Sequence, residues 1–139
     1  MGDRGNIVIR DSEPDDDVVF YTHWSGADVA AVVCRALAKK WRWDDANYLA
    51  RIVFCELVKG HENEETGYGI SRHLAGDNEH SVVVVDVGKQ EVFFSESDED
   101  NLLPINARCW SFEDYVMIGE DRATEFLNLD SDEDTELDE

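Results

Sequence analysis

The chain opens with two short apolar segments of the kind that form strands. Residues 6–10 and 18–22 are rich in β-branched side chains, and a polar segment, residues 11–17, separates them. Short runs of this composition, bounded by turn residues, predict β-strands. We expect the two strands to pair as a hairpin.

Three further segments predict a second group of strands. Residues 68–74 are followed by a Gly-Asp-Asn turn, and residues 81–87 then form the clearest strand pattern, SVVVVDV. Residues 90–95 come after a tight Gly-Lys turn. Their consecutive order predicts an antiparallel meander, and the unbroken Val run indicates a strand that is buried on both faces.

Between these two groups of strands, apolar residues recur at helical spacing. Residues 29–41 carry one apolar face behind Ser25, which we interpret as a helix N-cap. Residues 48–58 are apolar around much of the helix circumference and follow Asp44 or Asp45, either of which can cap a second helix. Because the connection is short, we expect an antiparallel helix pair.

The element order is two strands, two helices, three strands and a short helix over residues 112–118, or ββ-αα-βββ-(α). This order predicts an α+β fold in which one antiparallel sheet carries the helix pair on one face. We expect residues 1–95 to form this core domain. Residues 96–139 are expected to form an acidic C-terminal extension with a flexible tail, because the last ten residues carry seven acids and no base.

Charge changes this picture, because it is divided unevenly along the chain. The net charge is −21, of which residues 1–60 contribute −2 and residues 61–139 contribute −19. Solubility requires a net charge of only about 2–8 on a small domain. A field of this strength attracts basic surfaces and repels nucleic acid and anionic membranes. The charge therefore indicates a class of partner rather than a reaction.

The acids after residue 95 lack evident structural roles, and we identify them as the candidate partner-binding residues. Duplex DNA carries one negative charge per about 1.7 Å of its axis, and the proteins that bind it offer Lys and Arg to those phosphates. An array of carboxylates can occupy the same basic groove. The candidates are Glu96, Asp98, Glu99, Asp100, Glu113, Asp114, Glu120, Asp121, Glu125, Asp130 and Asp132.

The function favoured by the sequence is therefore that of an acidic DNA mimic, an inhibitor of a DNA-binding protein such as a bacterial defence nuclease or a CRISPR effector. The expected partner is a basic nucleic-acid-binding protein, and direct binding to nucleic acid or to a membrane is not expected. One alternative is an enzyme of unrecognised type. Its polar cluster at the strand ends would contain His23, Glu65, Tyr68, Asp77 and Asn78. A solvated acidic surface and a housekeeping domain adapted to high salt are further alternatives.

Other chemistry is weakly represented in the sequence. Three widely spaced Cys residues are typical of free thiols in a reducing cytoplasm, and no secretory signal is visible at the N-terminus. The expected location is the cytoplasm, or the host cytoplasm for a phage protein. The four His residues lack metal-ligand spacing, and the acidic tail lacks the Gly that a calcium loop needs at its sixth position. We expect neither a metal nor a cofactor.

The segment Trp41-Arg42-Trp43 admits two interpretations. Trp and Arg are common in binding hot spots, so the segment has the composition of a recognition surface. The interpretation that we favour is structural. In it, Trp41 ends the apolar face of the first helix, and Trp43 packs before the cap of the second.

Several short motifs give the chain a family resemblance. They are YTHW (residues 21–24), RWDD (42–45) with Tyr48, Arg51 and Phe54, ETGYGI (65–70), DNE (77–79) and VD (85–86). On these motifs, residues 6–94 resemble an uncharacterised family of small bacterial and phage proteins. The resemblance implies a shared domain but no known activity, so it supplies no site residues. In charge and size alone, the chain also resembles phage DNA-mimic proteins that block restriction or CRISPR nucleases.

Overall fold

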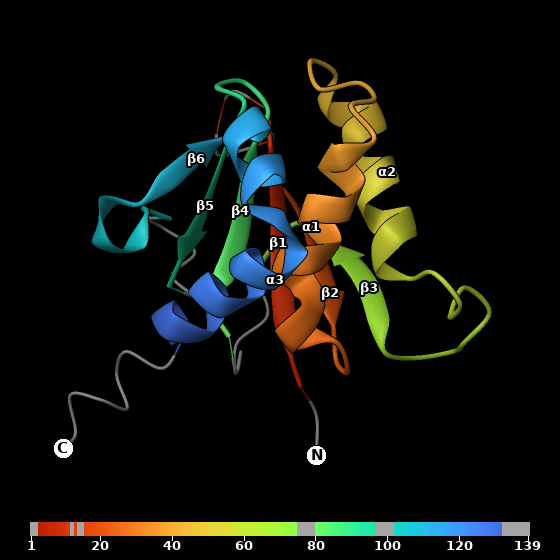
Figure 1. Ribbon diagram of the computed structural model, residues 1–139. Coiled ribbons are helices and arrows are strands. Elements are labelled where there is room, and N and C mark those ends of the chain that lie inside the picture. Colours follow the sequence, from red (N-terminus) through yellow and green to blue (C-terminus); the bar gives the residue numbers. More distant parts are fainter. Residues whose placement is uncertain (1–2, 12, 14–15, 75–79, 97–101, 132–139) are drawn as a thin grey trace, which may run out of the picture.

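One mixed β-sheet forms the centre of the molecule (Figure 1). The computed structural model describes residues 3–11, 13, 16–74, 80–96 and 102–131. Within them, six strands lie in the order β3-β2-β1-β4-β5-β6. Their bounds are β1 Gly5–Arg10, β2 Val18–Thr22, β3 Tyr68–Ser71, β4 Val82–Asp86, β5 Glu91–Ser95 and β6 Cys109–Ser111.

The two central strands, β1 and β4, pair in parallel, with Ile7 opposite Val83 and Ile9 opposite Val85. All other pairings in the sheet are antiparallel. The α+β class is therefore confirmed, whereas the expectation of a wholly antiparallel sheet is wrong. The physical reason lies in the apolar runs. Both strands are buried on both faces, and each therefore needs a paired strand along each of its two edges. Each strand is the other's partner along its inner edge.

The expected meander is confirmed only for β4 and β5, which form a hairpin. β3 instead pairs with β2 at one edge of the sheet, with Ile70 opposite Phe20. β3 is short and its last two residues are exposed, so it suits an edge and not a buried central place. The predicted β1–β2 hairpin is confirmed.

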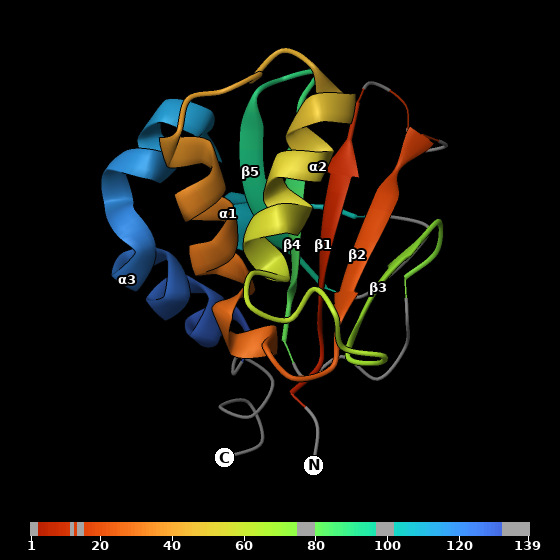
Figure 2. The same cartoon turned by 90° about the vertical axis from the view of Figure 1, so that its right-hand side faces the viewer.

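Three helices cover one face of the sheet, with α1 between α2 and α3 (Figure 2). Their bounds are α1 Val29–Ala38, α2 Ala46–Leu57 and α3 Phe112–Ser131, with short 3-10 helices η2 (Gly26–Asp28) and η3 (Ile105–Ala107). The main core lies between these helices and the sheet, around Ile7, Val83 and Leu37. Side chains of the opposite sheet face, including Val8 and Val84, form a second, smaller buried cluster with Leu102.

The third helix is longer than the predicted segment of residues 112–118. Gly119 interrupts it with a φ of 86°, a left-handed value that Gly adopts readily, and the helix then continues to Ser131. Ala123 and Leu127 beyond this kink are fully buried against the core. Their spacing, one turn apart, is the signal for the second half of the helix.

Strand β6 was not among the predicted elements. This strand has three residues and pairs with β5, with Trp110 opposite Val92. Such a short segment carries no readable alternation of apolar and polar residues. The predicted boundary between residues 95 and 96 thus falls between two paired strands. Beyond it, α3 buries Phe112, Tyr115 and Leu127 in the same core as β1 and β4.

Tyr115 provides a test of how firmly α3 belongs to this core. Its side chain is fully buried, its hydroxyl donates to the carbonyl of Ala30 at 2.8 Å, and its ring contacts Trp110 and Phe94. We predict that Tyr115→Ala lowers the free energy of unfolding by about 3–5 kcal/mol, because it leaves a large cavity. Urea unfolding measures the change.

Met117 on the same helix is the matched control, since it is 78% exposed. Met117→Ala should change the free energy of unfolding by no more than about 0.5 kcal/mol. Equal effects of the two substitutions would show that α3 is not packed as described.

Candidate functional site

The acids predicted from the sequence to bind a partner fall into three groups, according to how much of each residue the structure describes. Those within the described residues, Glu96, Glu113, Asp114, Glu120, Asp121 and Glu125, all have exposed side chains. Asp130 belongs to the last turn of α3, but its side chain is not described. Asp98, Glu99, Asp100 and Asp132 lie outside the described residues.

Five of these acids are exposed on α3, two before the Gly119 kink and three after it. The buried positions of the helix are taken by Phe112, Tyr115 and Leu127, which pack in the core. We name this surface the α3 acidic face and define it as Glu113, Asp114, Glu120, Asp121 and Glu125.

Ion pairs neutralise only part of the α3 acidic face. Glu120 accepts from Arg35 at 3.0 Å, and Glu125 pairs with Arg122 at 3.3 Å. Within the described part of the chain, no ion pair is formed by Glu113, Asp114 or Asp121.

The helix itself accounts for part of this arrangement. Glu113 and Asp114 occupy the first turn of α3, where negative charge is stabilised by the helix dipole. The hydroxyl of Ser111 accepts the backbone N–H of Asp114 at 3.0 Å and so caps the helix start. These two acids therefore have a structural role besides any role in binding, and Asp121, just after the Gly119 kink, stands likewise in the first turn of the second segment of the helix.

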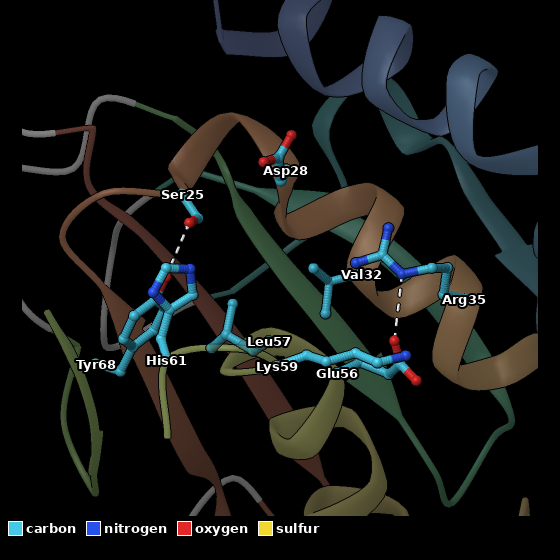
Figure 3. Close-up of a pocket in the computed structure, with 9 residues that line it drawn as sticks. All are labelled: Ser25, Asp28, Val32, Arg35, Glu56, Leu57, Lys59, His61 and Tyr68. Atoms are coloured by element: carbon cyan, nitrogen blue, oxygen red, sulfur yellow. Dashed lines mark hydrogen bonds and ion pairs between the residues drawn. The ribbon is translucent and has the colours of Figure 1, made fainter. Parts of the chain in front are cut away.

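A pocket of about 290 Å³ opens where α1, α2 and the start of β3 meet (Figure 3). The hydroxyls of Ser25 and Tyr68 hydrogen-bond across it at 3.1 Å. The ring of His61 packs on Tyr68 with centroids 5.5 Å apart, and its Nδ1 lies 2.6 Å from a carboxylate oxygen of Glu64. The lining residues are Ser25, Asp28, Val32, Arg35, Glu56, Leu57, Lys59, His61 and Tyr68.

Glu56 is the most buried charged group of this pocket, with 8% of its surface exposed. Its carboxylate accepts from Arg35 at 3.2 Å and pairs with Lys39 at 3.1 Å. Burial opposes ionisation, but the hydrogen bonds from Lys39 and Arg35 outweigh it and lower the pKa of Glu56. The carboxylate thus ties α2 to α1.

The enzyme alternative placed five residues together, and three of them, His23, Glu65 and Tyr68, lie within the described residues, where the backbone N–H of His23 donates to the carbonyl of Gly67 at 2.8 Å, next to Tyr68. His23 turns to Tyr21, whose hydroxyl lies 2.9 Å from its Nδ1, and packs edge-on against Trp24. Tyr68 turns to Ser25, and of the described members only Tyr68 lines the pocket. Asp77 and Asn78 lie outside the described residues.

Ser25 was interpreted as a helix N-cap, and it does occupy the N-cap position of η2, the turn that leads directly into α1. Its side chain, however, makes no capping hydrogen bond. Its hydroxyl is directed to Tyr68, 43 residues away in the sequence, so no local pattern could reveal the pair. The cap of α2 is confirmed at Asp45, which accepts the backbone N–H of Tyr48 at 3.3 Å.

The cysteines offer little nucleophilic character. All three are free, and Cys34 is buried. Desolvation raises the pKa of the Cys34 thiol, and desolvation with the nearby charge of Glu91 raises that of Cys109. Both shifts favour the thiol over the reactive thiolate.

The described residues offer neither a metal site nor a membrane-spanning helix. No three side chains of His, Cys, Asp or Glu are grouped so that they could hold a metal ion. No described helix combines the length and the apolar character that crossing a membrane requires.

Comparison of the chain with protein-family models, curated proteins and solved structures yields no match. The α3 acidic face carries uncompensated charge, whereas at the pocket Arg35 pairs with Glu56 and Glu120, and Glu56 also pairs with Lys39.

Glu56 gives a prediction about pH. Because its pKa is lower in the folded chain than the usual value of about 4.3 for an unfolded Glu, its ionisation stabilises the fold above that value. The contribution disappears as the pH falls through the folded pKa. We predict that Glu56→Gln costs about 1–2 kcal/mol at pH 7 and much less at pH 3.

Denaturant unfolding of both proteins at the two pH values checks this prediction. Glu125→Gln is the matched control, because Glu125 is exposed and its pair with Arg122 should contribute at most about 0.5 kcal/mol. A cost of Glu56→Gln that stays constant from pH 7 to pH 3 would contradict the role given to the carboxylate.

Proposed function

We propose that this protein is a non-enzymatic inhibitor that mimics DNA. Its α3 acidic face would occupy the basic nucleic-acid groove of a DNA-binding protein, with a bacterial defence nuclease or a CRISPR effector as the class of partner. The observation that carries the proposal is the set of exposed carboxylates of Glu113, Asp114 and Asp121. All three are exposed on α3 and form no ion pair within the described residues.

The spacing of these carboxylates supports the proposal. Glu113 and Asp114 occupy the first turn of α3 before the Gly119 kink, and Asp121 and Glu125 lie one helical turn apart beyond it. One turn rises about 5.4 Å, so these acids present negative charges at intervals of several ångströms. A groove that binds phosphates with Lys and Arg attracts these charges by the same electrostatics.

Apolar contacts at the same place also favour a protein partner. Met117, at 78% exposure, and Leu129, at 57%, are exposed on α3 among the acids. Met adapts its shape to varied surfaces, and its burial would remove water from around the neighbouring carboxylates. A face that served solubility alone would gain nothing from these side chains.

The charge of the rest of the chain adds a longer-range effect. A net charge of −21 accelerates encounter with a basic protein and opposes encounter with nucleic acid. The proposal therefore requires binding that weakens as salt increases, as protein–DNA binding does.

The test begins with the partner. The full chain is immobilised and offered a bacterial lysate at low salt, and the bound protein is eluted with a salt gradient. We expect the eluted partner to bind duplex DNA and to release it when the free chain is added. A partner that holds DNA and the chain at the same time, or an affinity indifferent to salt, would contradict mimicry.

A charge-neutral variant locates the binding face. We predict that Glu113→Gln, Asp114→Asn and Asp121→Asn together weaken partner binding by at least about tenfold, since each lost charge removes one contact to a basic groove. The matched control neutralises three exposed acids of the β1–β2 connection, Asp11, Glu13 and Asp16. Equal losses in both variants would mean that only the overall charge matters.

A further inference from the structure

A basic surface stands at one end of this acidic molecule. Residues 29–43 contain four bases and no acid, although the whole chain has a net charge of −21. We name this surface the basic corner and define it as six exposed residues of the α1–α2 connection and the start of α2. They are Lys39, Lys40, Trp41, Arg42, Tyr48 and Arg51.

Aromatic rings within the basic corner hold its cations in place. The ammonium of Lys39 lies 5.2 Å from the ring centre of Trp41, and the guanidinium of Arg42 lies 4.5 Å from that of Tyr48. Both rings remain about half exposed, at 57% for Trp41 and 50% for Tyr48. Cations and rings therefore share one accessible surface.

Part of this positive charge is uncompensated. Lys39 pairs with Glu56 at 3.1 Å, so its charge is already neutralised by an ion pair within the fold. Lys40, Arg42 and Arg51 form no ion pair with any described residue. Asp44 and Asp45 belong to the same connection, but Asp45 caps α2 by accepting from the backbone N–H of Tyr48, and these three cations remain to attract an anionic group.

The backbone of the basic corner is held in an unfavourable conformation. Lys40 and Arg42 have φ values of 60° and 58°, in the left-handed region that residues with long side chains rarely adopt. Trp43 anchors the loop, because its Nε1–H donates to the carbonyl of Leu37 at 3.1 Å and its ring packs on Phe112. Conformations of this kind are maintained at a cost and concentrate at binding sites.

We propose that the basic corner binds the acidic C-terminal segment, residues 130–139, of a second copy of this chain. That segment carries seven acids and no base. Carboxylates are the natural partners of the Arg guanidinium and the Lys ammonium. The single apolar side chain near its end, Leu137, can pack on an exposed ring such as that of Trp41.

The segment of the same chain is too far away to bind in this manner. The α1–α2 connection lies at one end of the molecule and the C-terminal end of α3 at the other, in both views (Figures 1 and 2). α3 has 20 residues, which span up to about 30 Å. Residues 132–139, even fully extended, reach at most about 29 Å. A segment of this length would have to extend back along α3 and would leave no residues to bind the basic corner. The occupant is therefore another molecule.

The proposed contact joins two different surfaces, so it is heterologous and continues from copy to copy as a chain or a ring. The net charge opposes the contact at long range. At about 0.1 M salt, however, charges more than about 10 Å apart are largely screened, and the attraction between corner and segment dominates at contact. This inference does not rest on the proposed inhibitor function, which depends on the α3 acidic face.

Two full-length variants test the contact. The corner variant carries Lys40→Asn and Arg42→Asn, since Asn removes each charge and tolerates a positive φ. The segment variant replaces the six acids of residues 132–139 by their amides. By sedimentation velocity at about 0.1 M salt, the unaltered chain should sediment faster as its concentration rises. Each variant alone should remain a monomer.

Mixing the two variants gives the decisive result. The segment variant retains the unaltered basic corner, and the corner variant retains the unaltered acidic segment. An equimolar mixture should therefore form a 1:1 complex and nothing larger. Lys59→Asn with Lys89→Asn removes two exposed bases from elsewhere and should associate like the unaltered chain. An unaltered chain that stays monomeric at every concentration would overturn the proposal. So would association that persists in both variants, or a mixture that forms no complex.

Discussion

The parallel pairing of β1 with β4 is the contact on which the rest of this structure depends. Both strands are buried on both faces, and they pair through residues that are about 75 positions apart in the sequence, such as Ile7 and Val83. A parallel pair cannot be closed by a tight turn, so the chain between the two strands must cross over the sheet. That crossing carries α1 and α2 onto one face and sends β3 to the edge beside β2.

The same constraint separates the charges. Once α1 and α2 cover their part of the sheet, α3 covers the rest of that face and packs against α1. Tyr115 hydrogen-bonds to Ala30, and Glu120 forms an ion pair with Arg35. Its outward face is then left for acids that need not pair. The connection of α1 to α2, at the far end from the last turn of α3, gathers the bases instead. The molecule thus presents an acidic helix face and a basic corner as distinct surfaces.

Local patterns predicted most elements but not their arrangement. The Val run of β4, the apolar stripe of α1 and the Asp45 cap of α2 all depend on neighbours within a few residues, and they were predicted correctly except at the end of α1, where Trp41 lies beyond the helix and is 57% exposed. The parallel pairing, the place of β3 and the bond from Ser25 to Tyr68 join distant parts of the chain. The acids of α3 were selected by charge alone, and their exposure follows from the burial of the other helix face. Their role in binding stays a prediction.

The most direct test of the central claim is to label carboxylates in the complex with the eluted partner. Carbodiimide coupling followed by mass spectrometry reports which acids are accessible to reagent. The account predicts that labelling of Glu113, Asp114 and Asp121 falls on binding and returns when duplex DNA displaces the partner, while Asp11, Glu13 and Asp16 label equally throughout. Unchanged labelling of the α3 acids in the bound chain would contradict it.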